Sequence, residues 1–151
     1  PNEVISIHSP TLGRLDIADE QLIAFAEPIA GFEGCLRYAL LPYRQSDRLD
    51  EAMAWLQAVD PPFHTFLVTD PWSAVPEYQP EIPDVEAVRI GAPGFADTSI
   101  LTILTVARPT RELTVNLQAP LLINTRDRVA KQVLLLNSET YGPRHRVCEL
   151  P

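Results

Sequence analysis

The stretch of sequence that decides the fold runs from Ser99 to Leu136, and its centre reads VNLQAPLLIN at residues 115–124. Residues 100–106 (ILTILTV), which precede this centre, are apolar on both alternating faces and rich in β-branched side chains. This pattern predicts a strand that is buried on both sides. Residues 129–136 (VAKQVLLL), which follow the centre, predict another strand. Between the two, Pro120 lacks a backbone donor and holds φ at about −65°, so we expect the chain to turn there and re-enter a sheet.

The rest of the chain has the spacing of an all-β domain. Ile5 and Ile7 alternate with polar residues, and turn residues follow them. Further short apolar runs recur about every 8–12 residues, which is typical of all-β domains. They predict strands over residues 12–17, 22–25, 36–41 and 63–69, and we expect Pro42 to end the strand at 36–41.

Two segments interrupt this pattern. Leu49, Met53 and Leu56 have helical spacing, which favours an amphipathic helix, so we expect a polar or helical loop at residues 46–52. Prolines interrupt regular pairing between residues 71 and 93, so this segment is expected to wrap over the barrel surface, with one helical turn at 84–88. The sequence therefore predicts one domain over residues 1–151, an all-β, barrel-like fold of short, mostly antiparallel strands with one or two short helical turns.

Composition narrows the class of protein. The 151 residues are 46% hydrophobic, which is enough apolar material for a proper core. The sequence has no run of about 18 apolar residues that would span a membrane, and residues 1–4 (PNEV) do not resemble a secretory signal. Cys35 and Cys148 are isolated, which favours reduced thiols over a disulfide framework. We therefore expect a cytoplasmic protein.

The net charge of −8 is unevenly distributed. Residues 51–97 contain eight carboxylates and one base, Arg89, whereas residues 101–151 have an excess of bases. An acidic middle third disfavours nucleic acid as a partner, because phosphate binding requires clustered Lys and Arg. It suits a basic protein partner, which the electrostatic field would steer and orient. The alternative is that most of these acidic residues have no binding role and only increase the solubility of the domain.

No catalytic template fits the sequence. It contains no G-x-S-x-G nucleophile elbow and no Gly-rich phosphate loop. His8, His64 and His145 are far apart and lack metal-ligand spacing. His64 could meet Cys35 or a carboxylate in space, but a lone histidine in a strand is more often structural. We therefore predict no catalytic, cofactor-binding or metal-binding residue.

Several short blocks, taken in order, resemble one known family. The most specific is TVNLxAPLLIN at residues 114–124, followed by KQVL at 131–134 and by Tyr141. Upstream blocks are GFE at 31–33, WLQ at 55–57 with Asp60, FLVTDP at 66–71 and YxPxIP at 78–83. This succession closely resembles the flagellar assembly factor family FliW. The resemblance also implies a strand at residues 53–59, where the apolar spacing alone favours a helix. The chain departs from the family pattern at Ala30 and Ala58, changes that should not disturb the fold.

The resemblance implies a function and a set of partners. FliW proteins bind CsrA, a small RNA-binding translational repressor, and so relieve repression of flagellin synthesis; they also bind flagellin. We therefore expect a non-enzymatic, protein-binding regulator that is a monomer when free, with CsrA and flagellin as partners, no cofactor, and no direct contact with nucleic acid or membrane. The motif residues are interpreted as fold residues: Gly31, Phe32, Glu33, Asn116, Leu117, Ala119, Pro120 and Asn124.

The candidate partner-binding residues come from the acidic middle third. Interfaces commonly depend on aromatic anchors, and Trp72 and Tyr78 are the aromatic residues that lie among its carboxylates, although Trp72 could equally be a core residue. The charges expected to steer a basic partner are Glu77, Glu81, Asp84 and Glu86.

Two other functional classes remain as alternatives. One is a small-ligand-binding or enzymatic β-barrel that uses the barrel mouth as a pocket. The other is a nucleic-acid-binding barrel, which would require the bases between Arg108 and Lys131 to converge on one face beside aromatic residues. That stretch contains no aromatic residue.

Overall fold

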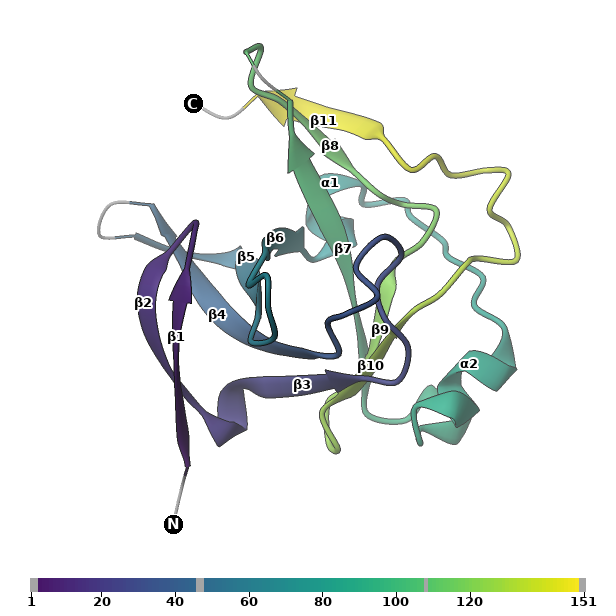
Figure 1. Ribbon diagram of the computed structural model, residues 1–151. Helices are drawn as coiled ribbons and strands as arrows, with labels where there is room; N and C mark the ends of the chain where they lie inside the picture. Colours follow the sequence, from purple (N-terminus) through teal and green to yellow (C-terminus); the bar gives the residue numbers. More distant parts are fainter. Residues whose placement is uncertain (1–2, 46–47, 108, 150–151) are drawn as a thin grey trace.

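The computed structural model describes residues 3–45, 48–107 and 109–149, and its centre is a closed β-barrel (Figure 1). Around the barrel the strands follow the order β7, β6, β5, β4, β3, β10 and β9, and β9 pairs back with β7. Neighbours are antiparallel except β3 and β10, which are parallel. The expected all-β, barrel-like fold is confirmed. The barrel strands are β3 (Leu22–Phe25), β4 (Arg37–Gln45), β5 (Arg48–Ala58), β6 (Thr65–Thr69), β7 (Thr98–Val106), β9 (Leu121–Asn124) and β10 (Val129–Gln132).

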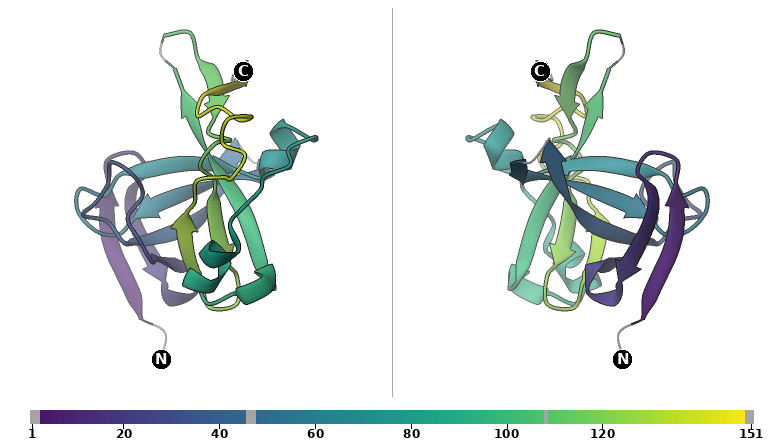
Figure 2. Two further views of the ribbon diagram at one scale, coloured as in Figure 1. Left: turned by 90° about the vertical axis from the view of Figure 1, so that its right-hand side faces the viewer. Right: turned by 90° about the vertical axis from the view of Figure 1, so that its left-hand side faces the viewer.

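Further elements surround the barrel. β1 (Val4–Ser9) and β2 (Gly13–Ala18) form a separate hairpin on one side, and β8 (Glu112–Val115) continues from β7 and pairs with β11 (His145–Glu149) (Figure 2). The helices are short: η1 (Asp19–Gln21), α1 (Pro71–Ala74), α2 (Asp84–Arg89) and η2 (Pro93–Phe95). The helical turn expected at 84–88 is α2. Within the described ranges, no helix is long and apolar enough to cross a membrane.

β7 separates two hydrophobic clusters. Ile103 packs against the cluster inside the barrel, which is built around buried Tyr38 and Val68. Leu104, the next residue, belongs to a second cluster outside the barrel, together with Leu117. Successive residues of a strand point to opposite faces, so the expectation that this strand is buried on both sides is confirmed.

Two asparagines form the turns that the central stretch requires. The Asn116 Oδ1 accepts hydrogen bonds from the backbone N–H groups of Gln118 (3.2 Å) and Ala119 (3.1 Å). The Asn124 Oδ1 accepts from the N–H groups of Arg126 (3.1 Å) and Asp127 (3.0 Å) in the same way. Short polar side chains that bond the backbone in this manner stabilise turns. Both contacts match the structural interpretation of these residues.

The strand expected at residues 129–136 is shorter than predicted. β10 ends at Gln132, and the next residues bond to a turn and a loop instead of a strand. The N–H of Val133 donates to the Pro120 carbonyl (2.9 Å), and that of Leu136 donates to the Glu81 carbonyl (2.7 Å). An apolar run in the sequence indicates a buried or extended segment. It does not show whether the backbone of that segment will hydrogen-bond to a neighbouring strand or to a loop.

The hairpin of β4 and β5 is longer than predicted. β4 does not end at Pro42 but continues to Gln45, with a register shift between Pro42 and Tyr43. A bulge is one of the places where a sheet tolerates proline. Part of the loop expected at 46–52 lies outside the described residues, at 46 and 47, while residues 48–52 belong to β5. The expectation of a helical loop there is wrong, because cross-strand pairing with β4 outweighs the helical spacing of three apolar residues.

Candidate partner-binding surface

The acidic segment, defined here as residues 70–89, leads from the end of β6 through α1 and α2. It lies on the outside of the barrel, on the side away from the β1–β2 hairpin (Figures 1 and 2). Its start is fixed locally, because the Asp70 side chain caps α1 by accepting a hydrogen bond from the N–H of Trp72 (3.0 Å). Pro71 takes the first helical position, where the missing N–H is not required.

Leu117 in the centre of the deciding stretch (residues 115–124) and Asn137 just after this stretch hold the acidic segment in place. The Tyr78 hydroxyl donates to the Leu117 carbonyl (2.7 Å) in a buried position. The Asn137 side chain donates to the Gln79 carbonyl (2.8 Å), and its Oδ1 accepts from the N–H of Glu81 (2.9 Å). The central stretch of the sequence therefore determines where the acidic segment lies.

The structure separates the two aromatic candidates. Trp72 is 39% exposed, and its indole N–H donates to the Tyr78 carbonyl (2.9 Å), so the ring has a fixed position with one part open to solvent. Tyr78 is only 2% exposed and packs edge-on against Tyr141, with ring centroids 4.8 Å apart. Burial, and secondly Tyr141, raise the pKa of the Tyr78 hydroxyl far above its usual range. The expectation that Tyr78 is an exposed anchor is wrong, because its hydroxyl finds a partner within the fold.

The carboxylates also divide into two groups. Glu77, Glu81 and Asp84 are exposed. Glu86 is buried, and its oxygens lie 3.0 Å from the Lys131 Nζ and 2.8 Å from Arg89. Burial alone would raise the pKa of the Glu86 carboxyl, but the hydrogen bonds from these two bases outweigh it and lower the pKa. Glu86 is therefore a structural ion-pair partner, and the expectation that it steers a binding partner is wrong.

Exposed apolar side chains next to these acids were missed from the sequence. Val85 and Val88 of α2 are 48% and 59% exposed, and Leu134 and Leu136 are 61% and 68% exposed. The backbone bond from Leu136 to Glu81 places the leucine segment beside the acidic segment. This exposure was not predicted from the sequence, where Leu134 and Leu136 belong to the apolar run that predicts a strand over residues 129–136.

The Gly31-Phe32-Glu33 block has a structural role. Gly31 has a φ of +91°, a conformation that favours glycine, and Phe32 stacks on the His64 ring with centroids 4.2 Å apart. Gln132 ties this loop to the central motif: its Oε1 accepts from the N–H of Ala30 (3.1 Å), and its Nε2 donates to the Ala119 carbonyl (3.3 Å). Gln132, a residue of the KQVL block, therefore joins the loop that carries the GFE block to the TVNLxAPLLIN block.

His64 has the partners of a packed residue. Its Nε2 lies 2.8 Å from the Tyr38 hydroxyl, and its Nδ1 lies 3.7 Å from the Cys35 Sγ. Burial lowers the pKa of His64, and burial followed by the charge of Asp60 raises the pKa of Cys35. A thiol and an imidazole shifted in these directions are both neutral, which is opposite to a catalytic thiolate–imidazolium pair. Within the described ranges, no group of three potential metal ligands occurs.

Comparisons with known proteins identify the family to which this chain and its barrel fold belong. The family model "FliW protein" matches residues 6–147. The flagellar assembly factor FliW of Pseudothermotoga lettingae is 34% identical over 93% of this chain and 87% of its own length, and that of Bacillus subtilis is 30% identical over 93% and 95%. A crystal structure of the flagellar assembly factor FliW superposes with a TM-score of 0.80 and 31% identity, covering 94% of this chain and 96% of the other. This chain therefore belongs to the FliW family of flagellar assembly factors.

Proposed function

We propose that this FliW-family protein is a non-catalytic regulator that binds CsrA, thereby relieving repression of flagellin synthesis, and that it also binds flagellin. The observation that carries the proposal is the composition of the acidic segment. Three of its exposed carboxylates, Glu77, Glu81 and Asp84, lie along the same segment as exposed Trp72 and the two exposed valines of α2. Such a surface combines charge for orientation with apolar area for affinity.

Each part of this surface has a distinct task in the proposed complex. Glu77, Glu81 and Asp84 form no ion pair within the part of the chain that the structure describes. Their negative potential draws in a basic RNA-binding protein and opposes the binding of RNA next to the interface. Trp72 supplies the anchor, and the exposed valines of α2 with Leu134 and Leu136 add apolar contact farther along the segment. A stable interface needs on the order of 1,200–2,000 Å² of buried surface, so it would extend beyond these residues.

The test is binding to immobilised CsrA, and separately to flagellin, at about 50 mM and about 500 mM NaCl, where screening differs several-fold. We expect affinity for CsrA to fall steeply with salt. The double variant Glu81→Lys/Asp84→Lys should bind at least about tenfold more weakly at low salt, and Trp72→Ala should lose about tenfold at both salt concentrations.

A matched control variant changes the net charge of the protein by the same amount but at a site far from the acidic segment. Asp19 and Glu20 are exposed on η1, next to the β1–β2 hairpin, so Asp19→Lys/Glu20→Lys should retain most of the affinity. If the two double variants weaken CsrA binding equally, net charge alone acts and the acidic segment is not the interface. If the folded wild-type protein binds neither CsrA nor flagellin, the proposed function is wrong.

A further inference from the structure

The barrel wall splits between β6 and β7. The two strands pair through Thr69 with Thr102, Val68 with Ile103 and Leu67 with Leu104, and the ladder ends there. Beyond this point β6 stays with β5, where Phe66 pairs with Leu56, whereas β7 turns toward β8, where Val106 pairs with Leu113. Two strand edges therefore diverge from a common point.

The backbone groups at this split point into it. In an antiparallel ladder, the N–H and C=O of one residue face the same neighbour, and successive residues alternate. The His64 carbonyl accepts from the N–H of Ala58 on β5, so Thr65 faces the opposite way, toward the split. The Ile103 carbonyl accepts from the N–H of Asn116, and the N–H of Ala107 donates to Glu112. Ile103 of β7 and Ala107, which follows β7, therefore face β8. Since successive residues alternate, the backbone of Val106, next to Ala107, faces the split from the other side.

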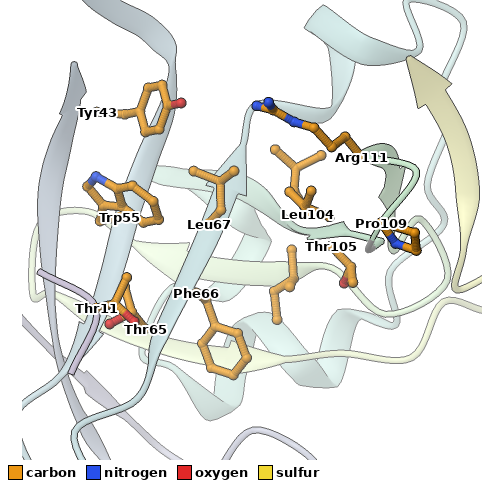
Figure 3. A pocket seen from close by; sticks show the side chains of 12 residues that line it. Thr11, Tyr43, Trp55, Thr65, Phe66, Leu67, Leu104, Thr105, Pro109 and Arg111 are labelled. Carbon is orange, nitrogen blue, oxygen red and sulfur yellow. The ribbon is translucent and has the colours of Figure 1, made fainter. Parts of the chain in front are cut away.

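The split opens into a groove of about 970 Å³ (Figure 3). Tyr43 and Trp55 line one side, with ring centroids 5.2 Å apart, and Leu104 and Thr105 line the other, with Phe66 and Leu67 between them. The Arg111 side chain reaches over the groove from the β7–β8 turn. Among the described residues that line the groove, Arg111 is the one with a charged side chain, in a chain whose net charge is −8.

Strand edges next to apolar surface attract another chain, and proteins usually block them with charges, proline or a covering loop. Here two edges flank an open groove floored by aromatic and aliphatic side chains. We propose that this groove binds an extended segment of a partner protein by strand addition, with apolar side chains at alternate positions in the groove and a carboxylate next to Arg111. Main-chain bonds to the β7 edge at Val106 would supply affinity, and the alternate pockets with Arg111 would supply specificity.

The groove is a different surface from the acidic segment, and the ligand that its Arg111 favours is acidic, whereas the acidic segment favours a basic partner. A small molecule would contact the apolar floor of the groove but would not bond to the strand edges. Recognition of the ligand's backbone therefore distinguishes a bound peptide from a bound small molecule.

The experiment is selection from a displayed library of random heptapeptides on the folded full-length protein. We expect enriched peptides to have apolar residues at alternate positions and an acidic side chain or a free C-terminal carboxylate at one end. Val106→Pro removes the backbone donor that faces the split and leaves the N–H groups that face β8 in place. This variant should bind the enriched peptides at least about tenfold more weakly, with its fold checked by circular dichroism.

Modified peptides provide a second test that leaves the protein unchanged. N-methylation at one set of alternate positions should reduce affinity at least about tenfold, while methylation at the other set should have little effect, because only every second N–H of a strand added to β7 faces the β7 edge. Arg111→Gln should remove the preference for a carboxylate. Equal tolerance of both methylation patterns, or no enrichment of peptides on the wild-type protein, would overturn the proposal.

Discussion

Lys131 is the residue whose substitution tests the packing of α2 most directly. Its Nζ lies 3.0 Å from Glu86 and 3.0 Å from Glu27, and only 7% of its side chain is exposed. Replacing Lys131 with Met keeps most of the apolar stem and removes the ammonium group, which leaves the buried Glu86 with Arg89 as its remaining cationic partner. Removing one member of a buried pair typically destabilises a protein by about 3–5 kcal/mol.

The partner that remains sets the expected magnitude. Since Arg89 still compensates Glu86 from a half-exposed position, we expect Lys131→Met to lower the free energy of unfolding by about 2–3 kcal/mol. For a chain of this length, that corresponds to a fall in Tm of roughly 5–10 °C. The double variant Lys131→Met/Glu86→Leu removes both buried charges and should recover at least about half of the loss.

Urea unfolding followed by tryptophan fluorescence provides the assay. Arg14→Met is the control, because the Arg14–Asp16 pair is largely exposed and should change stability by no more than about 0.5 kcal/mol. The Glu86 carboxyl has a lowered pKa in the folded state, so its stabilisation is complete above the ordinary value of 4.5 and is lost as the pH falls through the folded value. The gap between wild type and Lys131→Met should therefore narrow below about pH 4.5. A loss under about 1 kcal/mol, or a double variant whose loss equals the sum of the two single losses, would refute this reasoning.

Three further substitutions follow from the same structure. Tyr78→Phe leaves the Leu117 carbonyl without its buried donor and should lower the free energy of unfolding by about 1–2 kcal/mol in urea titrations. Asn124→Ala removes the turn bonds of a residue that is 1% exposed, and its bond to the Ile90 carbonyl (2.9 Å), and should cost about 2–3 kcal/mol, whereas a change below about 0.5 kcal/mol would contradict the role assigned to it. Burial lowers the pKa of His64, so the unfolded chain takes up the proton first, and stability that is present above pH 6.5 is lost as the pH falls through the folded value. His64→Gln should therefore flatten the dependence of Tm on pH just below pH 6.5, and an unchanged slope would exclude His64 as the cause.

The parts of the fold that the sequence predicted well are those governed by local pattern. Residues 100–106 alternate two apolar faces, and the strand β7 indeed lies between two clusters. Pro71 and Pro83 interrupt pairing, and short helices begin at or just after these positions. Side-chain periodicity and the missing N–H of proline act over a few residues, so they can be recognised without knowledge of the tertiary structure.

The incorrect predictions concern residues whose environment comes from distant parts of the chain. Tyr78 lies among carboxylates in the sequence, but its hydroxyl bonds to Leu117. Glu86 belongs to an acidic run, yet it is neutralised by Lys131 of β10. The groove between β6 and β7 could not be predicted either. It forms because the two strands pair with each other at one end, whereas at the other end β6 pairs with β5 and β7 pairs with β8.

The roles of the motif residues have a consequence for experiments on binding. Leu117 and Lys131 lie in the blocks that carry the family resemblance, and both hold the acidic segment through buried contacts. The Leu117 side chain packs in the same buried cluster as Tyr78, and the Lys131 side chain pairs with buried Glu86, so substitution of either should reduce stability and partner binding together. Glu81 and Asp84 are exposed and have no such role, so their substitution should reduce binding with little effect on stability. Comparing affinity and unfolding free energy for the same variants therefore separates residues that present the surface from residues that contact the partner.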